Sequence, residues 1–275
     1  MQVFNPNPGI PPRVLATDLD GTLIPLPGND DNLTALEILR QAFQAERLRL
    51  VFATGRHLES VLDAMRQHAL PTPDWIVCDV GTSIYRRKQD VFVRFVLYEE
   101  MLAGQTHGAD RVDIERLLIG INGLTLQPSD RQQRFKISYV SSAAGAEQLA
   151  DLVNRRLAGS HLPFACLTSI DPFHNVGLLD ILPVGASKAA ALLWLATQAA
   201  FSPDEIIFAG DSGNDFAALA CGFRAIVVAN APAGLADRVE RELNRRHLAH
   251  RLFRAAQPAT SGVLEGCRHF GLVLN

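Results

Sequence analysis

Val14-Leu15-Ala16-Thr17-Asp18-Leu19-Asp20-Gly21-Thr22 decides the fold, because an apolar run ends abruptly there in two carboxylates and a glycine. Short apolar runs bounded by turn residues are typical of buried strands in parallel sheets. Charged side chains are seldom buried without partners, so Asp18 and Asp20 need an explanation. Ligand sites of open α/β sheets lie at this carboxyl end of the strands. Alternatively, both aspartates bond loop amides in an Asx turn, and the stretch alone leaves both interpretations open.

The composition is that of an ordinary globular protein. The chain has 275 residues, of which 48% are hydrophobic and 20% charged, enough for a substantial core in one large domain or two. No apolar run reaches the roughly 18 residues of a membrane-spanning helix. Residues 1–12 lack the basic start and apolar centre of a signal peptide. We therefore expect no membrane partner.

Charge and cysteine usage narrow the class further. The net charge of −3 and the lack of an aromatic-basic stripe argue against a nucleic-acid partner. The scattered residues Cys78, Cys166, Cys221 and Cys267 form no CxxC pair, which argues against a disulfide framework or a zinc site. We expect reduced thiols in a cytoplasmic protein that is a monomer or a weak oligomer.

Strand and helix patterns alternate along most of the chain. This alternation predicts an α/β fold with a doubly wound parallel sheet and helices on both faces. The predicted strands are residues 48–53, 75–78, 206–209 and 225–229, and the predicted helices are residues 33–45, 58–69, 188–200, 216–221 and 232–245.

The middle third has a different pattern. Residues 90–98 and 134–140 alternate apolar with polar side chains, as half-exposed antiparallel strands do. Helices are expected at residues 110–119 and 146–157, and further strands at residues 164–169 and 176–182. We therefore predict a core of residues 1–85 and 181–275 and an inserted α+β cap domain of residues 86–180.

The segment Ala53-Thr54-Gly55-Arg56 ends the second predicted strand just before a helix. A hydroxyl group and free amides at a helix N-terminus form an anion site. The alternative is that Thr54 only caps the helix.

Lys188 lies in the first turn of a predicted helix, with Ser187 as the N-cap. Its charge opposes the helix macrodipole there by roughly 0.3–1 kcal/mol, so another interaction should keep a cation at this position. An ammonium is a compact charge suited to a phosphoryl oxygen. The chain has 26 basic residues, and its only other lysines are Lys88 and Lys136. Alternatively, Lys188 faces solvent and has no role.

Phe208-Ala209-Gly210-Asp211-Ser212-Gly213-Asn214-Asp215-Phe216 is another apolar strand that ends in carboxylates. Four aspartates at one sheet edge would repel one another, and a cation would neutralise them. Oxygen ligands with room for water and phosphate suit Mg²⁺. Asp18, Asp211 and a backbone carbonyl near Asp20 are sufficient as ligands.

Together, DLDGT, ATGR, a lysine and GDSGND, in this order, resemble the haloacid dehalogenase-like phosphohydrolase superfamily. The insert is similar to the larger α+β cap class of this superfamily, which implies a Rossmann-like core. Phrases at residues 79–82, 136–139 and 179–183 look like sucrose-6-phosphate phosphatases and related sugar phosphatases. Two departures are Gly21, where the sucrose enzymes often have asparagine, and Ala189, where glycine is usual. The first leaves the identity of the sugar open.

The resemblance implies hydrolysis of a small-molecule sugar phosphate through an aspartyl-phosphate. Asp18 would be the nucleophile, and Asp20 the general acid and base. Thr54, Lys188 and Mg²⁺ would hold the phosphoryl oxygens. The implied metal ligands are Asp18, Asp20, Asp211 and Asp215, and the implied phosphate- and substrate-binding residues are Thr54, Gly55, Arg56, Lys136, Lys188 and Asn214.

Lys136 is expected to read the sugar. Phe135, Ile137 and Tyr139 share one face of the predicted strand, and Arg134, Lys136 and Ser138 share the other. If the apolar set packs on helices, the polar face is left for hydrogen bonds to the sugar, or it simply meets water. Three alternative functions stay open: a phosphatase for another glycosyl phosphate, a sugar phosphomutase and a non-catalytic sugar-phosphate binding module.

Overall fold

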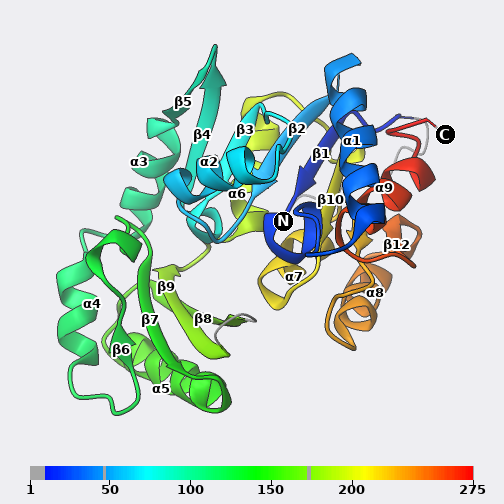
Figure 1. The fold of residues 1–275 in the computed structure, drawn as a ribbon. Helices are drawn as coiled ribbons and strands as arrows, with labels where there is room; N and C mark the ends of the chain where they lie inside the picture. The colour runs from blue at the N-terminus through cyan, green and yellow to red at the C-terminus, as the bar shows by residue number, and fades with distance from the viewer. Residues whose placement is uncertain (1–9, 46–47, 172–174, 275) are drawn as a thin grey trace. The chain divides into compact units, whose positions relative to one another are not determined.

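The computed structural model describes residues 10–45, 48–171 and 175–274. It contains an eight-stranded sheet in the order β12-β11-β10-β1-β2-β3-β4-β5 (Figure 1). Its strands are β1 (Val14–Thr17), β2 (Arg49–Ala53), β3 (Trp75–Cys78), β4 (Ser83–Lys88), β5 (Val91–Arg94), β10 (Ile206–Gly210), β11 (Arg224–Val227) and β12 (Leu252–Arg254). All neighbouring strands are parallel except β3–β4 and β4–β5, so the predicted parallel core is confirmed.

Helices cover both faces of this sheet. On one face, Leu15, Phe52 and Ile207 belong to a buried core with α1 (Asp30–Ala45), α2 (Leu58–Gln67) and α9 (Ala259–His269). On the other, α6 (Lys188–Gln198), α7 (Phe216–Ala220) and α8 (Leu235–Arg245) pack against one another and the strands. The strands are apolar on both sides because both sides are buried, as the continuous apolar runs predict.

The strand predicted at residues 90–98 is shorter than expected, and it does not belong to the insert. Only β5 is extended, and it pairs with β4 at the edge of the large sheet. Residues after Arg94 form α3 (Val96–Gln105), because Tyr98 and Leu102 are four residues apart and are buried together on one side of a helix. The alternating pattern indicated a strand with one apolar and one polar face, but it could not indicate which sheet the strand joins.

A second antiparallel sheet has the order β6-β7-β9-β8. It is formed by β6 (Thr125–Leu126), β7 (Ile137–Ser142), β8 (Phe164–Asp171) and β9 (Val176–Pro183). The helices α4 (Arg111–Leu118) and α5 (Ala146–Gly159) bury Ile137, Leu179 and Ile181 on one of its faces. The structure therefore contains the α+β insert that the middle third of the sequence predicts.

The chain divides into two compact units, and the boundaries between them lie between Arg94 and Phe95 and between Ala186 and Ser187. The predicted boundaries at residues 86 and 180 lie elsewhere. At the first, β4 and β5 hydrogen-bond to the large sheet. At the second, β9 continues to Pro183, which pairs with Phe164 of β8.

Other predicted elements match to within a few residues, and the backbone explains the differences. The helix predicted at residues 58–69 ends at Gln67, and Ala69 takes a left-handed φ of 49°. The helix predicted from residue 232 begins at Leu235, after Gly234 with a φ of 86°. β12 and α9 were not predicted from the sequence. No helix in the described ranges is long and apolar enough to cross a membrane.

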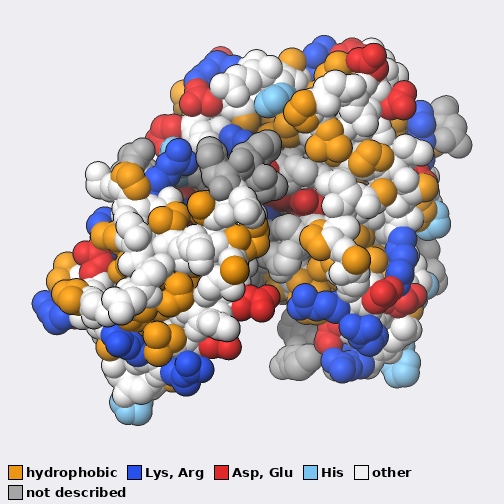
Figure 2. All heavy atoms as spheres, turned by 60° about the horizontal axis from the view of Figure 1, so that its bottom comes forward, with side chains coloured by type: hydrophobic (Ala, Val, Ile, Leu, Met, Phe, Trp, Pro, Cys, Tyr) orange, Lys and Arg blue, Asp and Glu red, His pale blue; other side chains and the backbone are white. Residues whose placement is uncertain are grey.

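Surface charges pair with opposite charges along α8 and β12. Arg245 lies 2.9 Å from Glu242, and Arg254 lies 2.8 Å from Asp237 and 2.7 Å from Glu240. Figure 2 shows basic and acidic side chains interspersed on the face that it presents. Exposed pairs of this kind contribute little to stability, so these charges are best understood as solvated surface.

Asn32, in the first turn of α1, ties the loop after β1 to the chain near α9. Its buried side chain accepts the N–H of Leu26 at 3.1 Å. It also donates to the carbonyl of Pro258 at 3.1 Å and to Ser261 Oγ at 2.7 Å. The segment that follows Asp20 is thus fixed by residues more than 200 positions later in the chain.

We expect Asn32→Ala to lower the free energy of unfolding by about 2 kcal/mol, because buried backbone groups lose their partner. Thr34→Ala is the matched control on α1, since Thr34 Oγ1 is exposed and bonds only its own helix, to Asp30. This control should change stability by less than about 0.5 kcal/mol. Urea unfolding of both variants measures the difference. Equal free energies of unfolding for Asn32→Ala and Thr34→Ala would contradict the conclusion that Asn32 fixes the loop after β1.

Candidate active site

Asp18 lies at the carboxyl end of β1, between the ends of β2 and β10. Its N–H donates to the carbonyl of Ala209 at 2.9 Å, and its side chain is buried. The chain then turns sharply through Leu19–Leu23, where Gly21 has a φ of 72°. A Cβ at Gly21 would lie 2.5 Å from Asp211 Oδ2, so a side chain here would require this carboxylate to move. The two carboxylate-bearing loops are therefore packed directly against each other.

Lys188 joins the two carboxylate segments. Its Nζ donates to Asp18 Oδ1 at 2.8 Å and to Asp215 Oδ1 at 2.7 Å, and the side chain is fully buried. Burial works to lower the pKa of Lys188, but the two carboxylates outweigh it and raise the pKa above its ordinary value. Ser187 caps α6 as predicted, accepting the N–H of Ala190 at 3.1 Å. The alternative of a solvent-facing lysine is wrong, since the carboxylates offset its unfavourable place in the helix dipole.

Asp215 organises the loop that carries Asp211. Its Oδ2 accepts the N–H of Asp211 at 3.2 Å, and the N–H and Oγ of Ser212 at 3.0 and 2.9 Å. Its Oδ1 accepts Lys188, and the side chain is fully buried. A Cβ at Gly210 would lie 2.7 Å from Asp215 Cγ, which explains the glycine before Asp211. One carboxylate thus fixes both the loop and the lysine.

Asp211 completes a group of carboxylates that can hold a metal ion. Oxygen atoms of Asp18, Asp211 and Asp215 lie within 4.8 Å of one another. Burial, together with the charge of Asp215, raises the pKa of Asp211 to about 6, and burial is the main cause of a strongly raised pKa at Asp18. Three carboxylates face one ammonium, and this excess of negative charge adds to the effect of burial on both pKa values. A hard divalent cation such as Mg²⁺ fits this oxygen-rich, negatively charged site.

The carboxylate of Asp20 lies outside this group of side chains, and the sequence suggested a backbone carbonyl near Asp20 as the ligand instead. Arg56 binds the Asp20 carboxylate, with Nε to Oδ2 at 2.7 Å and Nη2 to Oδ1 at 2.6 Å. The hydrogen bond to Asp20 raises the pKa of Arg56. Arg56, predicted to bind phosphate, therefore holds the second aspartate of DLDGT in a two-point ion pair.

Thr54 is buried at the carboxyl end of β2. The register pairs Thr17 with Phe52, which places Asp18 next to Ala53 and one residue from Thr54 across the strands. The alternative that Thr54 caps the helix is wrong, because His57 precedes the first residue of α2. Thr54 Oγ1 instead accepts the N–H of Arg56 at 3.2 Å, which shapes the loop through Gly55.

Asn214 is half-buried in the Asp211 loop, where its Oδ1 accepts the hydroxyl of Ser212 at 3.0 Å. Two further residues of this region were not predicted as site residues. Thr22 Oγ1 donates to Asp211 Oδ1 at 2.9 Å, and Asn230 Nδ2 donates to the carbonyl of Gly21 at 2.8 Å. Thr22 belongs to the DLDGT motif, whereas no sequence pattern links Asn230 to Gly21.

Lys136 lies in the second unit, just before β7. Its Nζ is 3.9 Å from Asp180 Oδ1, and its side chain is 12% exposed. Phe135, Ile137 and Tyr139 are each buried, and Ile137 and Tyr139 belong to the same core. Ser138, however, is buried too and donates to Asp180 Oδ1 at 2.6 Å, so the expected open polar face is wrong at this residue. The neighbouring strand β9 supplies the acidic partner that the sequence of β7 alone could not reveal.

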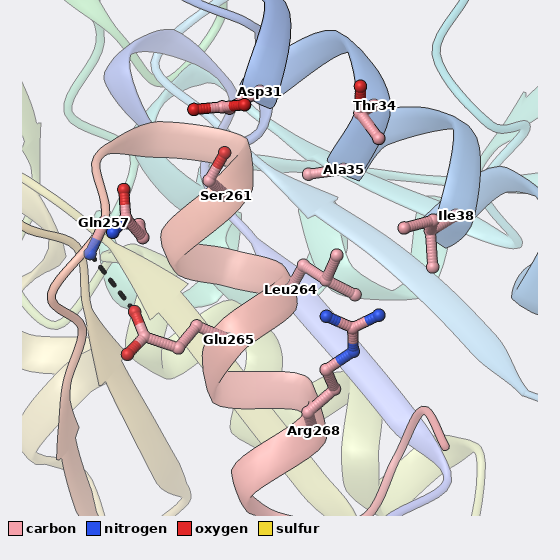
Figure 3. A pocket seen from close by; sticks show the side chains of 9 residues that line it. All are labelled: Asp31, Thr34, Ala35, Ile38, Gln257, Ser261, Leu264, Glu265 and Arg268. Carbon is pink, nitrogen blue, oxygen red and sulfur yellow. Dashed lines mark hydrogen bonds between the residues drawn. The ribbon is translucent and has the colours of Figure 1, made fainter. Parts of the chain in front are cut away.

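A separate groove of about 530 Å³ lies between α1 and α9 (Figure 3). Ala35 and Ile38 on α1 line it with Leu264 and Arg268 on α9. It contains none of the predicted catalytic or substrate-binding residues. The candidate active site is therefore the carboxylate-lysine cluster and not this groove.

Comparison with known proteins identifies the family of this chain. A model of the sucrose-6F-phosphate phosphohydrolase family matches residues 11–271. The chain belongs to this family. A HAD-like hydrolase of Nitrosococcus oceani is 32% identical over 264 residues, covering 94% of this chain and 71% of that protein. The mannosylfructose-phosphate phosphatase of Agrobacterium fabrum is 31% identical over 264 residues, covering 95% of this chain and 98% of its own.

Among solved structures, the sucrose-phosphatase from Synechocystis sp. PCC6803, in complex with sucrose and phosphate, superposes with a TM-score of 0.77. The match covers 95% of this chain and 99% of that one at 24% identity, and it supports the fold alone. The predicted resemblance is confirmed, and the enzyme is a HAD-like sugar phosphatase.

We expect Mg²⁺ to stabilise the protein more at about pH 7.5 than at about pH 5, because the cation competes with a proton on Asp211. The folded-state pKa of about 6 lies above the ordinary 3.8. In the metal-free protein, the contribution of this group to stability is therefore present below pH 3.8 and is lost as the pH rises through about 6. Thermal unfolding with and without Mg²⁺ at the two pH values measures this.

Asp211→Asn is the control for this experiment, since it keeps the shape of the side chain and removes the titrating charge. The pH dependence of the Mg²⁺ effect should largely disappear in it. An equal Mg²⁺ effect at both pH values in the wild-type protein would contradict the assigned site.

Proposed function

We propose that this enzyme hydrolyses the phosphomonoester of a phosphorylated disaccharide, with Mg²⁺ bound at the carboxylate cluster and an aspartyl-phosphate formed on Asp18. The observation that carries the proposal is the Lys188 ammonium, held between Asp18 and Asp215 in a buried site. In this arrangement, a phosphoryl group could contact the proposed nucleophile, Asp18, and the positive charge of Lys188 at the same time.

Asp18 is the proposed nucleophile. An oxygen of its carboxylate forms a bond to phosphorus while the bond from phosphorus to the sugar oxygen breaks. Attack requires the ionised carboxylate, yet burial raises the pKa of Asp18. The hydrogen bond from Lys188 opposes this shift and favours the ionised form. Mg²⁺, when bound by Asp18, Asp211 and Asp215, supplies further positive charge for the carboxylates and the phosphoryl oxygens.

Asp20 is the proposed general acid and base. It would give a proton to the departing sugar oxygen and then take one from the water that attacks phosphorus on Asp18. The two-point ion pair with Arg56 fixes the orientation of this carboxylate.

Thr54 and Lys188 are proposed to hold the phosphoryl oxygens. Thr54 comes directly after β2, the strand that pairs with β1, and Lys188 is the first residue of α6. Both residues therefore belong to the unit that contains the eight-stranded sheet. Charge that shifts onto the oxygens in the transition state would be met by a donor and an ammonium already in place. Gly55 and Asn214 are proposed to contact the phosphoryl group or the sugar nearby.

The proposed substrate class rests on the family and on one relative. The family is named for sucrose-6F-phosphate, and the Agrobacterium fabrum relative for mannosylfructose-phosphate. Both names describe a phosphorylated disaccharide. We propose that Lys136, beside Asp180 in the second unit, helps to bind sugar hydroxyls, since the pair offers a donor and an acceptor side by side.

A phosphate-release panel tests the function directly. Sucrose-6-phosphate, mannosylfructose-phosphate, single-sugar phosphates and p-nitrophenyl phosphate should be compared with Mg²⁺ and with EDTA. We expect a disaccharide phosphate to give the highest kcat/KM and EDTA to abolish turnover. A preference for single-sugar phosphates, or full turnover by metal-stripped enzyme, would contradict the proposal.

Lys136→Ala extends the same panel to the sugar contact. Loss of a hydrogen bond from a charged group should raise KM for the preferred sugar phosphate by roughly ten- to a hundredfold. Hydrolysis of p-nitrophenyl phosphate, which has no sugar, should be nearly unchanged. The exposed Lys88 provides the matched control, and Lys88→Ala should leave both substrates unaffected. Equal losses on both substrates in Lys136→Ala would exclude a role in sugar binding.

A further inference from the structure

The turn between β3 and β4 has an uncommon backbone conformation. Asp79, Val80 and Gly81 have successive φ values of 55°, 58° and 96°. A β-branched residue is a genuine outlier in the left-handed region, because its side chain crowds the backbone. Such strain persists only where the surrounding structure fixes it, and it occurs most often at functional sites.

One side of this turn is hydrogen-bonded to the loop that carries Thr54. The N–H of Val80 donates to the carbonyl of Thr54 at 3.1 Å, and the N–H of Asp79 donates to the carbonyl of Arg56 at 3.0 Å. These two bonds bracket Gly55. The left-handed conformation is what aims both N–H groups at the neighbouring loop.

The other side of the turn touches the start of α6. A Cβ at Gly81 would lie 2.2 Å from the carbonyl carbon and oxygen of Ser187 and 2.6 Å from the backbone nitrogen of Lys188. The obstacle is backbone, which a rotamer change cannot relieve. The turn therefore acts as a spacer between Thr54 and Lys188, and it is in contact with the main chain at both ends.

The turn is also fixed from within. Thr82 Oγ1 donates to the carbonyl of Asp79 at 2.9 Å, and Ser83 Oγ donates to Asp79 Oδ2 at 2.7 Å. The side chains of Asp79, Val80, Thr82 and Ser83 are all buried. Ser83 is the first residue of β4 and Thr82 precedes it, so the sheet itself anchors the conformation.

We propose that the Asp79–Gly81 turn is a positioning element that sets the distance between Thr54 and Lys188, and that Gly81 is its essential positioning residue. The inference rests on the proposed function, which gives Thr54 and Lys188 the phosphoryl oxygens to hold. It explains why the turn is left-handed at three successive residues and why the third is glycine. A displacement of about 1 Å at either residue is enough to cost about a hundredfold in rate.

Gly81→Ala tests this, with Gly28→Ala as the matched control. Gly28 has a φ of 71°, so alanine there meets a similar backbone penalty, but nothing lies within 4 Å of its added Cβ. For p-nitrophenyl phosphate, we expect kcat to fall about a hundredfold in Gly81→Ala and to stay within about threefold in Gly28→Ala. The inhibition constant for inorganic phosphate should rise in Gly81→Ala only, because the groups that hold phosphate are displaced.

A folded Gly81→Ala variant with the kcat and phosphate inhibition of the control would overturn the inference. If Gly81→Ala does not fold, Val80→Gly decides. It keeps the backbone hydrogen bonds and releases the φ restriction, so kcat should fall at least about tenfold and phosphate inhibition should weaken. Gln89→Gly, which releases a φ of 55° in the β4–β5 turn, is its control. Val80→Gly with the same kcat as this control would also overturn the inference.

The same experiment separates the two proposals. If the wild-type enzyme and Gly28→Ala release no phosphate from any substrate of the panel, the proposed function fails. If they are active and both turn variants match their controls, the proposed function stands and the positioning role fails.

Discussion

The buried ammonium of Lys188 is the interaction on which the rest of this site depends. It donates to Asp18 and to Asp215 at hydrogen-bond distance, with no exposure to solvent. Removal of one partner from a buried ion pair leaves a charge without compensation, which is strongly destabilising. Even with the lysine present, the three carboxylates exceed the one ammonium by two charges, and burial together with the charge of Asp215 raises the pKa of Asp211. The protein therefore retains an electrostatic cost that a divalent cation can offset.

The sheet order explains how distant segments meet at this lysine. β1 lies between β10 and β2, so the residues that follow these strands share one edge. Lys188 enters from α6, which begins immediately after the second unit ends at Ala186. The Asp79–Gly81 turn connects the Thr54 loop to the start of α6.

Much of this arrangement could be predicted from the sequence, because continuous apolar runs identify buried parallel strands and the carboxylates follow them directly. Side-chain direction within a loop could not be predicted. The ion pair between Asp20 and Arg56 was not predicted, since spacing in the sequence fixes neither rotamer. Likewise, alternation in residues 134–140 showed which side chains share a face, but the burial of Ser138 depends on Asp180 from a strand about 40 residues later. Such partners become visible only once the register of the strands is known.

Identification of the phosphorylated residue during turnover tests the central claim most directly. Enzyme quenched in acid while it hydrolyses p-nitrophenyl phosphate should carry a phosphoryl group on Asp18, located by mass spectrometry of its peptides. Asp20→Asn should accumulate more of this species, since it lacks the base for the second step, whereas Asp18→Asn should show none. A phosphoryl group on another residue, or steady turnover in Asp18→Asn, would contradict the account.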